Sequence, residues 1–151
     1  MDGKRITSYL PDSPEELQLR LDRYTNNQKQ LIKLGAANRV PVVLAIQPEI
    51  TAKATQSSGQ TAEILNSLGN DYQTKMKEYY PELIAVGKKL EKDLPSNVKF
   101  IDFYNFDKLP ADSFIDAIHL TDEGNKAIAE QLYYSIADLA KMQIQPANID
   151  L

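Results

Sequence analysis

The 151-residue sequence contains no cysteine and only one histidine, His119. Without cysteine the chain can form no disulfide and has no thiolate to act as nucleophile or metal ligand. A single imidazole among scattered carboxylates is a poor ligand set for a transition metal. We therefore expect neither a metal site nor a cofactor, and the lack of cysteine leaves the compartment open.

Long apolar runs and basic blocks are also missing. The longest apolar run, residues 42–46, is far too short to cross a bilayer, and no signal-peptide pattern opens the chain. The net charge is −4, and the 17 Lys and Arg residues are scattered, which argues against a nucleic-acid partner. Localisation stays open, because a chain truncated at its N-terminus could have lost a signal peptide. The length and composition favour one globular domain.

Helical signals occur in three parts of the sequence. In the first, Ser13 is a candidate N-cap, Pro14 suits the first helical position and Glu16 completes a capping box, which predicts a helix over residues 14–34 that Gly35 ends.

The second helical part has apolar residues at helical spacing from Ile64 to Leu94, interrupted at Pro81. Pro81 should start a new helix or bend the old one. The third part predicts a closing helix over residues 122–142, with Thr121 as its N-cap.

Two segments resemble buried strands, residues 40–46 and 98–104, because their apolar runs are short and continuous. Residues 51–60 are small, polar and aperiodic and predict a mobile loop. The order helix, strand, helical segment, strand, helix is a βαβ unit with flanking helices, which implies a parallel pair and a right-handed crossover. The fold class is therefore α/β.

The most informative stretch is Asp116-Ala117-Ile118-His119-Leu120-Thr121, followed by Gly124 at the start of the closing helix. A carboxylate that fixes the tautomer of an imidazole makes the histidine a general base. The stretch follows the second strand, where open α/β sheets place their ligands. Asp-x-x-His spacing alone would more often be an ordinary surface pair. The helix start after it and its position favour a catalytic motif.

Asp-x-x-His followed by Leu-Thr-x-x-Gly resembles the last motif of the SGNH (GDSL-type) hydrolases. The resemblance implies a partial flavodoxin-like α/β/α sandwich with a parallel sheet, of which this chain contributes two strands and several long helices. It also implies hydrolysis of ester bonds by a Ser-His-Asp triad, in which Asp116 is the acid and His119 the base.

The other motifs of that family are missing. Its nucleophile lies in a Gly-Asp-Ser turn, and none of the eight serines here lies in such a triplet. Residues 69–71 have the sequence Gly-Asn-Asp, which is similar to the Gly-x-Asn-Asp oxyanion motif of the family, but they lie within a helical pattern. Residues 1–3 occupy the position where that motif would end. We therefore expect residues 1–151 to be the C-terminal portion of one SGNH domain, without the N-terminal strands and the serine motif.

Gln47 and Glu49 follow the first strand on the edge where a substrate would lie, so both are candidate substrate-binding residues. For Glu49 a solvated loop position is the better interpretation from the pattern alone. A strand at residues 40–46 without a neighbour should expose an apolar edge, so we expect an N-terminal partner segment, homo-oligomer formation or marginal stability. Two functions stay open: an ester hydrolase completed by a missing segment or another chain, and a non-catalytic interaction module derived from one.

Overall fold

The computed structural model describes residues 10–53 and 59–140, which form two strands and several helices. In chain order the elements are α2 (Pro14–Ala37), β1 (Val42–Ile46), the 3-10 helix η1 (Ile50–Lys53), α3 (Gly59–Leu68), α4 (Asn70–Asp93), β2 (Val98–Asp102) and α5 (Asp122–Leu139). The strands are parallel, with Val42 opposite Val98 and Ile46 opposite Asp102. This confirms the predicted βαβ unit.

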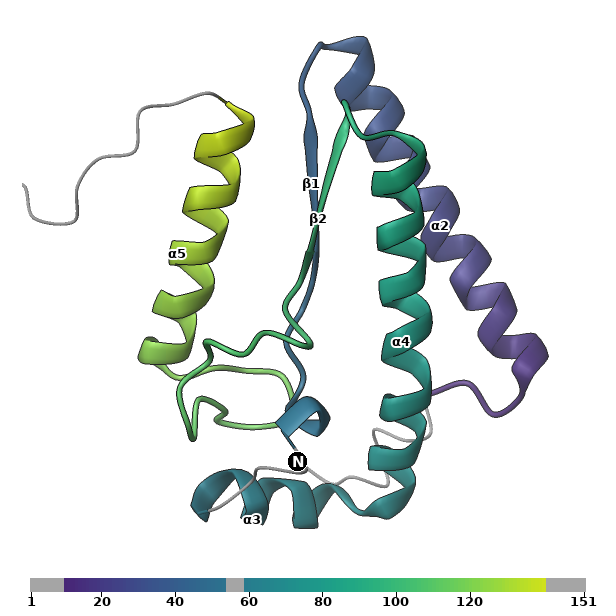
Figure 1. Ribbon diagram of the computed structural model, residues 1–151. Helices are drawn as coiled ribbons and strands as arrows, with labels where there is room; N and C mark the ends of the chain where they lie inside the picture. Colours follow the sequence, from purple (N-terminus) through teal and green to yellow (C-terminus); the bar gives the residue numbers. More distant parts are fainter. Residues whose placement is uncertain (1–9, 54–58, 141–151) are drawn as a thin grey trace, which may run out of the picture.

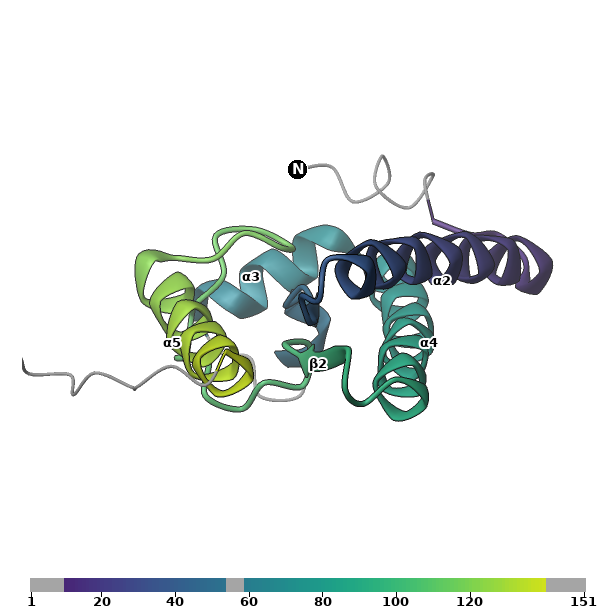
Figure 2. The same ribbon diagram turned by 90° about the horizontal axis from the view of Figure 1, so that it is seen from above.

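Helices cover both faces of the two strands (Figures 1 and 2). Helices α2 and α4 lie on one side, and α5 lies on the other, so the layers are α/β/α, as the fold class predicted. Helix α3, η1 and the segment before α5 gather at the carboxyl ends of the strands. None of the described helices is long and apolar enough to cross a membrane.

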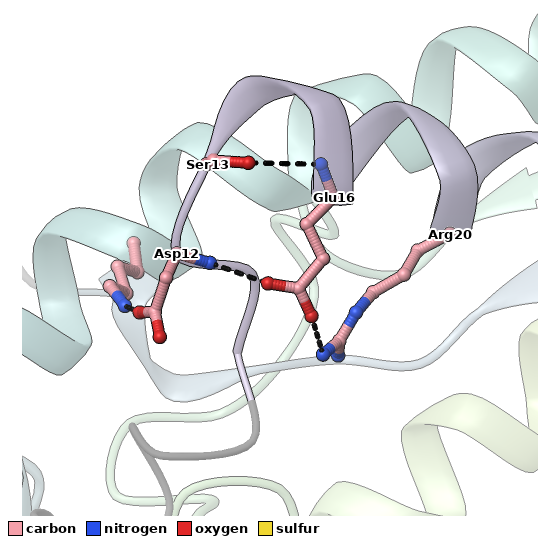
Figure 3. Close-up of polar contacts among 5 residues, drawn as sticks. Asp12, Ser13, Glu16 and Arg20 are labelled. Atoms are coloured by element: carbon pink, nitrogen blue, oxygen red, sulfur yellow. Dashed lines mark hydrogen bonds and ion pairs between the residues drawn. The ribbon is translucent and has the colours of Figure 1, made fainter.

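Helix α2 begins at the N-cap that the sequence predicted, but only half of the predicted capping box forms (Figure 3). Ser13 Oγ accepts a hydrogen bond from Glu16 N at 3.2 Å, while Glu16 Oε2 accepts one from Asp12 N at 3.0 Å. The first bond satisfies an N–H group that the first turn leaves without a partner. The second reaches Asp12, the residue before the N-cap, and not Ser13 N as a full capping box requires. The helix continues three residues beyond the predicted end at residue 34.

Gly35 does not end α2 because its role is close packing. A Cβ atom on Gly35 would lie 2.7 Å from both Val40 O and Val42 Cγ2. The turn after the helix instead passes through Arg39, whose φ is 58°. The absence of a side chain at Gly35 therefore lets the chain fold back closely into β1.

The break in the second helical segment falls at Gly69 and not at Pro81. Gly69 has a φ of 81°, a conformation that favours glycine, and it separates α3 from α4. Pro81 is exposed and lies inside an α4 that is continuous from Asn70 to Asp93. On the buried side of α4, Gly87 packs directly on the Phe100 ring, because a Cβ there would lie 2.1 Å from Phe100 Cε2.

Other predicted boundaries also differ from the structure. Strand β1 begins at Val42 and β2 ends at Asp102, so both are shorter than predicted. The loop predicted at residues 51–60 is wrong at both ends, since Thr51 lies in η1 and Gly59 begins α3. Helix α5 ends at Leu139; residues 141 and 142 of the predicted helix, like residues 1–3, lie outside the described part.

Candidate functional site

The loop between β2 and α5 folds back on itself to present the Asp-x-x-His motif. Phe114 and Leu120 form an antiparallel bridge, and Ile115 N donates to His119 O at 2.8 Å. Both bridge residues are buried, so they anchor the loop in the core. Asp116 and His119 lie in the turn between them.

Asp116 and His119 form a hydrogen-bonded pair. His119 Nδ1 lies 2.8 Å from Asp116 Oδ2, while Asp116 Oδ1 accepts from the backbone N–H groups of Ile118 at 3.0 Å and His119 at 2.9 Å. Because a carboxylate only accepts, the ring proton belongs on Nδ1, which leaves Nε2 as the basic nitrogen. The His119 side chain is 64% exposed and that of Asp116 30%.

The surroundings of Asp116 keep its carboxyl group ionised. Partial burial has the largest single influence on its pKa and acts to raise it. The two backbone N–H groups and the imidazole together outweigh burial and hold the pKa of Asp116 below its usual value. The imidazole therefore faces a full negative charge at neutral pH.

The Leu-Thr-x-x-Gly part of the motif attaches the loop to α5. Thr121 Oγ accepts from Gly124 N at 3.3 Å and caps the helix. A Cβ atom on Gly124 would lie 3.1 Å from Cβ of both Leu120 and Ser113. Thus the threonine starts the helix, and the glycine lets its first turn pack tightly against the loop.

Two hydrogen bonds connect this loop to the segment that follows β1. Ile50 N donates to Ala117 O at 3.0 Å, and Gln47 Nε2 donates to Ile118 O at 3.3 Å. A hollow of about 240 Å³ lies beside the pair, lined by Gln47, Pro48, Ile118, His119, Leu120, Asn125 and Ile128. The structure thus brings Gln47 to the same hollow as His119.

Glu49 lies elsewhere. Its side chain is 1% exposed, so the solvated-loop interpretation is wrong, and it is not among the residues that line the hollow. Tyr72 OH donates to Glu49 Oε1 at 3.0 Å, and Thr51 N donates to Oε2 at 3.0 Å. Burial raises the pKa of Glu49, and these hydrogen bonds oppose that effect. No local sequence pattern indicated this network, because Tyr72 is 23 residues away in the chain.

Within residues 10–53 and 59–140, no hydroxyl forms a hydrogen bond with His119 Nε2. Ser113 is buried and donates to Pro110 O at 2.6 Å, while Ser13 caps α2. Gly69 and the two residues after it lie at the junction of α3 and α4. In the same part of the chain no group of three or more His, Asp and Glu side chains is placed to hold a metal ion.

The sequence matches the model of a known protein family. The sequence model described as GDSL-like Lipase/Acylhydrolase matches residues 5–132, a span that contains Asp116, His119 and Gly124. Searches of curated proteins and of solved structures found no match.

Proposed function

The chain belongs to the GDSL-like lipase/acylhydrolase family, and on that premise we propose that it supplies the base and the acid of a Ser-His-Asp site that hydrolyses ester bonds. His119 is the general base and Asp116 is the acid that orients it. The contact of 2.8 Å between His119 Nδ1 and Asp116 Oδ2 carries this proposal, because it leaves Nε2 free to take a proton.

In the proposed reaction a serine hydroxyl attacks the ester carbonyl carbon while its proton moves to His119 Nε2. The tetrahedral intermediate then collapses, the C–O bond to the alcohol breaks, and the alcohol leaves with the proton from Nε2. A water molecule then attacks the acyl carbon while its proton moves to Nε2. The C–O bond to the serine breaks, and Nε2 returns the proton to the serine oxygen as the acid leaves. Throughout, the carboxylate of Asp116 stabilises the imidazolium.

We assign the serine and the oxyanion donors to a region outside the described residues: an N-terminal segment of the same domain, or another chain. The described chain then corresponds to the C-terminal portion of the domain. Support comes from Ser113, the serine nearest to the motif in sequence, whose hydroxyl is buried and already bonded to Pro110 O.

The ester would lie in the hollow beside His119. Its apolar side chains, Ile118, Leu120 and Ile128, suit the hydrocarbon part of a small ester. Gln47 provides a polar contact there. Its Nε2 donates to Ile118 O, and its amide oxygen accepts no hydrogen bond from residues 10–53 and 59–140, so it is placed to accept one from a substrate.

The second candidate is a non-catalytic interaction module that keeps the motif as a relic. It is favoured by the edges of the sheet: among the described residues β1 pairs with β2 alone. A strand with an open edge can accept another strand.

Hydrolysis of p-nitrophenyl acetate separates the two. The wild-type chain is compared with His119→Ala, with Asp116→Asn, and with Lys126→Ala, an exposed position on α5 that serves as the matched control. Since an exposed imidazole reacts slowly with this ester by itself, the chain unfolded in urea gives the background rate. We expect turnover above that background that is lost in His119→Ala and kept in Lys126→Ala.

If the chain alone shows no such turnover, the same variants are assayed in a chain extended by the residues encoded upstream of Met1. Turnover that depends on His119 in either form supports the proposed function. Its absence in both overturns the hydrolase assignment and favours the interaction module.

A further inference from the structure

Glu49 is a buried carboxylate that the proposed chemistry does not use. It is 1% exposed, and none of the ion pairs in the described part of the chain involves it. Burying a carboxylate is costly unless hydrogen bonds replace its hydration. The hydrogen-bond partners of Glu49 must therefore replace its hydration, and these partners show what the buried side chain holds in place.

Three donors meet the two oxygens of Glu49. The N–H and the hydroxyl of Thr51 both donate to Oε2, the former at 3.0 Å, and Tyr72 OH donates to Oε1 at 3.0 Å. Thr51 Oγ also lies 3.2 Å from Tyr104 OH, and the Tyr104 ring stacks on that of Tyr80, with centroids 4.5 Å apart. The carboxylate thus joins η1 to α4 and to the segment after β2.

The residue between Glu49 and Thr51 contacts the motif loop. Ile50 is fully buried, and its N–H donates to Ala117 O at 3.0 Å. Ala117 is itself buried and directly follows Asp116. Ile50 lies between Glu49, which carries the carboxylate, and Thr51, whose N–H and hydroxyl donate to that carboxylate. These hydrogen bonds therefore fix the orientation of the Ile50 N–H.

We propose that Glu49 is a positioning residue: together with Thr51 and Tyr72 it fixes η1, so that the Ile50 N–H holds the loop that carries Asp116 and His119. A site held in this way is formed before substrate arrives. The inference rests on the proposed function only in giving the loop a catalytic role. The experiment below measures the structure of the loop and needs no enzymatic turnover.

The test compares Glu49→Gln with Glu49→Leu. Glutamine keeps one oxygen for the two donors of Thr51, and its NH₂ group can donate to Tyr72 OH, which turns to accept it. Leucine has a similar size but accepts no hydrogen bond, so the donors of Thr51 and Tyr72 lose their partner. Leu90→Ala is the control, since Leu90 is buried near the other end of α4.

Two NMR readouts report on the loop: hydrogen exchange of the Ile50 amide, and the ¹⁵N shifts of the His119 ring, which show which nitrogen carries the proton. We expect Glu49→Gln to match the wild type in both. In Glu49→Leu the Ile50 amide should exchange about tenfold faster than in Leu90→Ala compared at equal global stability, as for the loss of one hydrogen bond to a charged group. The preference of His119 for the Nδ1–H form should fall as well.

Two results would overturn the proposal. If Glu49→Gln disrupts the loop as much as Glu49→Leu, the charge and not the hydrogen bonding matters. If Glu49→Leu behaves like Leu90→Ala, the side chain is ordinary core. Should Glu49→Leu fail to fold, Tyr72→Phe takes its place, because it removes one donor to Glu49. Exchange of the Ile50 amide should then rise and the preference of His119 for the Nδ1–H form should fall, both by less than in Glu49→Leu. Absence of His119-dependent turnover in both the chain and its extended form would refute the proposed function, and these NMR readouts would remain valid.

Discussion

Replacing Asp116 with asparagine should move the ring proton of His119 from Nδ1 to Nε2. Asp116 Oδ1 accepts two backbone N–H groups, whose direction is fixed. The side-chain oxygen of the introduced asparagine must therefore take that position, because its NH₂ group there would leave both backbone donors unsatisfied, at about 1–3 kcal/mol each. The NH₂ group then faces His119 Nδ1 and donates to it. The ring nitrogen has to accept, and its proton goes to Nε2.

The exposure of the His119 side chain determines how strongly Asp116 favours the Nδ1–H tautomer. A hydrogen bond to a charged acceptor contributes about 1.5–3 kcal/mol. The His119 side chain is 64% exposed, so solvent reduces the contribution of this pair to about 1 kcal/mol. That corresponds to roughly a fivefold shift of the tautomer ratio towards the Nδ1–H form in the wild type, relative to an imidazole without this partner. Wherever the chain has activity, the wrong tautomer should lower turnover by up to about 10⁴-fold.

Long-range ¹H–¹⁵N NMR can measure this directly, because His119 is the only histidine and gives a single imidazole signal set. Spectra are recorded at a pH where the ring is neutral. The wild type and Asp138→Asn, an exposed position late in α5, should show the Nδ1–H form, and Asp116→Asn the Nε2–H form. The same tautomer in the wild type and Asp116→Asn would refute the reasoning.

Gly124→Val should lower the free energy of urea unfolding by about 1–3 kcal/mol because its Cβ meets Leu120 and Ser113 at 3.1 Å; an equal loss in Ala129→Val, an exposed position on α5, would contradict the packing account. Since burial raises the pKa of Glu49 above its ordinary 4.5, the native state keeps a proton that the unfolded state has already released above that pH. The wild type should therefore lose stability relative to Glu49→Gln as the pH rises from about 4.5 towards neutral. A difference between their free energies of urea unfolding that does not change with pH would contradict this. Light scattering after size exclusion should show self-association, or thermal unfolding should show marginal stability; a clean monomer that melts cooperatively at high temperature would exclude both.

Local signals in the sequence predicted the parts of the fold that depend on neighbouring residues. Ser13, Pro14 and Glu16 placed the start of α2 correctly, because capping involves contacts within one turn. The family resemblance and the α/β/α arrangement are confirmed. The family resemblance rested on Asp116 and His119 followed by Leu-Thr-x-x-Gly, and the threonine and glycine of that motif each have a local structural role at the start of α5.

The errors arose where a residue acts through distant partners. Gly35 looked like a helix end, yet its close contacts are with Val40 and Val42. Glu49 looked like a residue of a polar loop, yet its donors include Tyr72 on α4. No periodicity or capping pattern encodes such contacts, because they form only once the strands bring separate segments together.

The central claim is that the acid–base half of an ester hydrolase site is assembled here and that its nucleophile is not among the described residues. A fluorophosphonate, which reacts with serine hydroxyls activated by a base, tests this when the labelled residues are located by mass spectrometry. We predict no labelling that depends on His119 at the serines of residues 10–53 and 59–140, which are Ser13, Ser67, Ser96, Ser113 and Ser135. A label at any of these five that disappears in His119→Ala would contradict the claim.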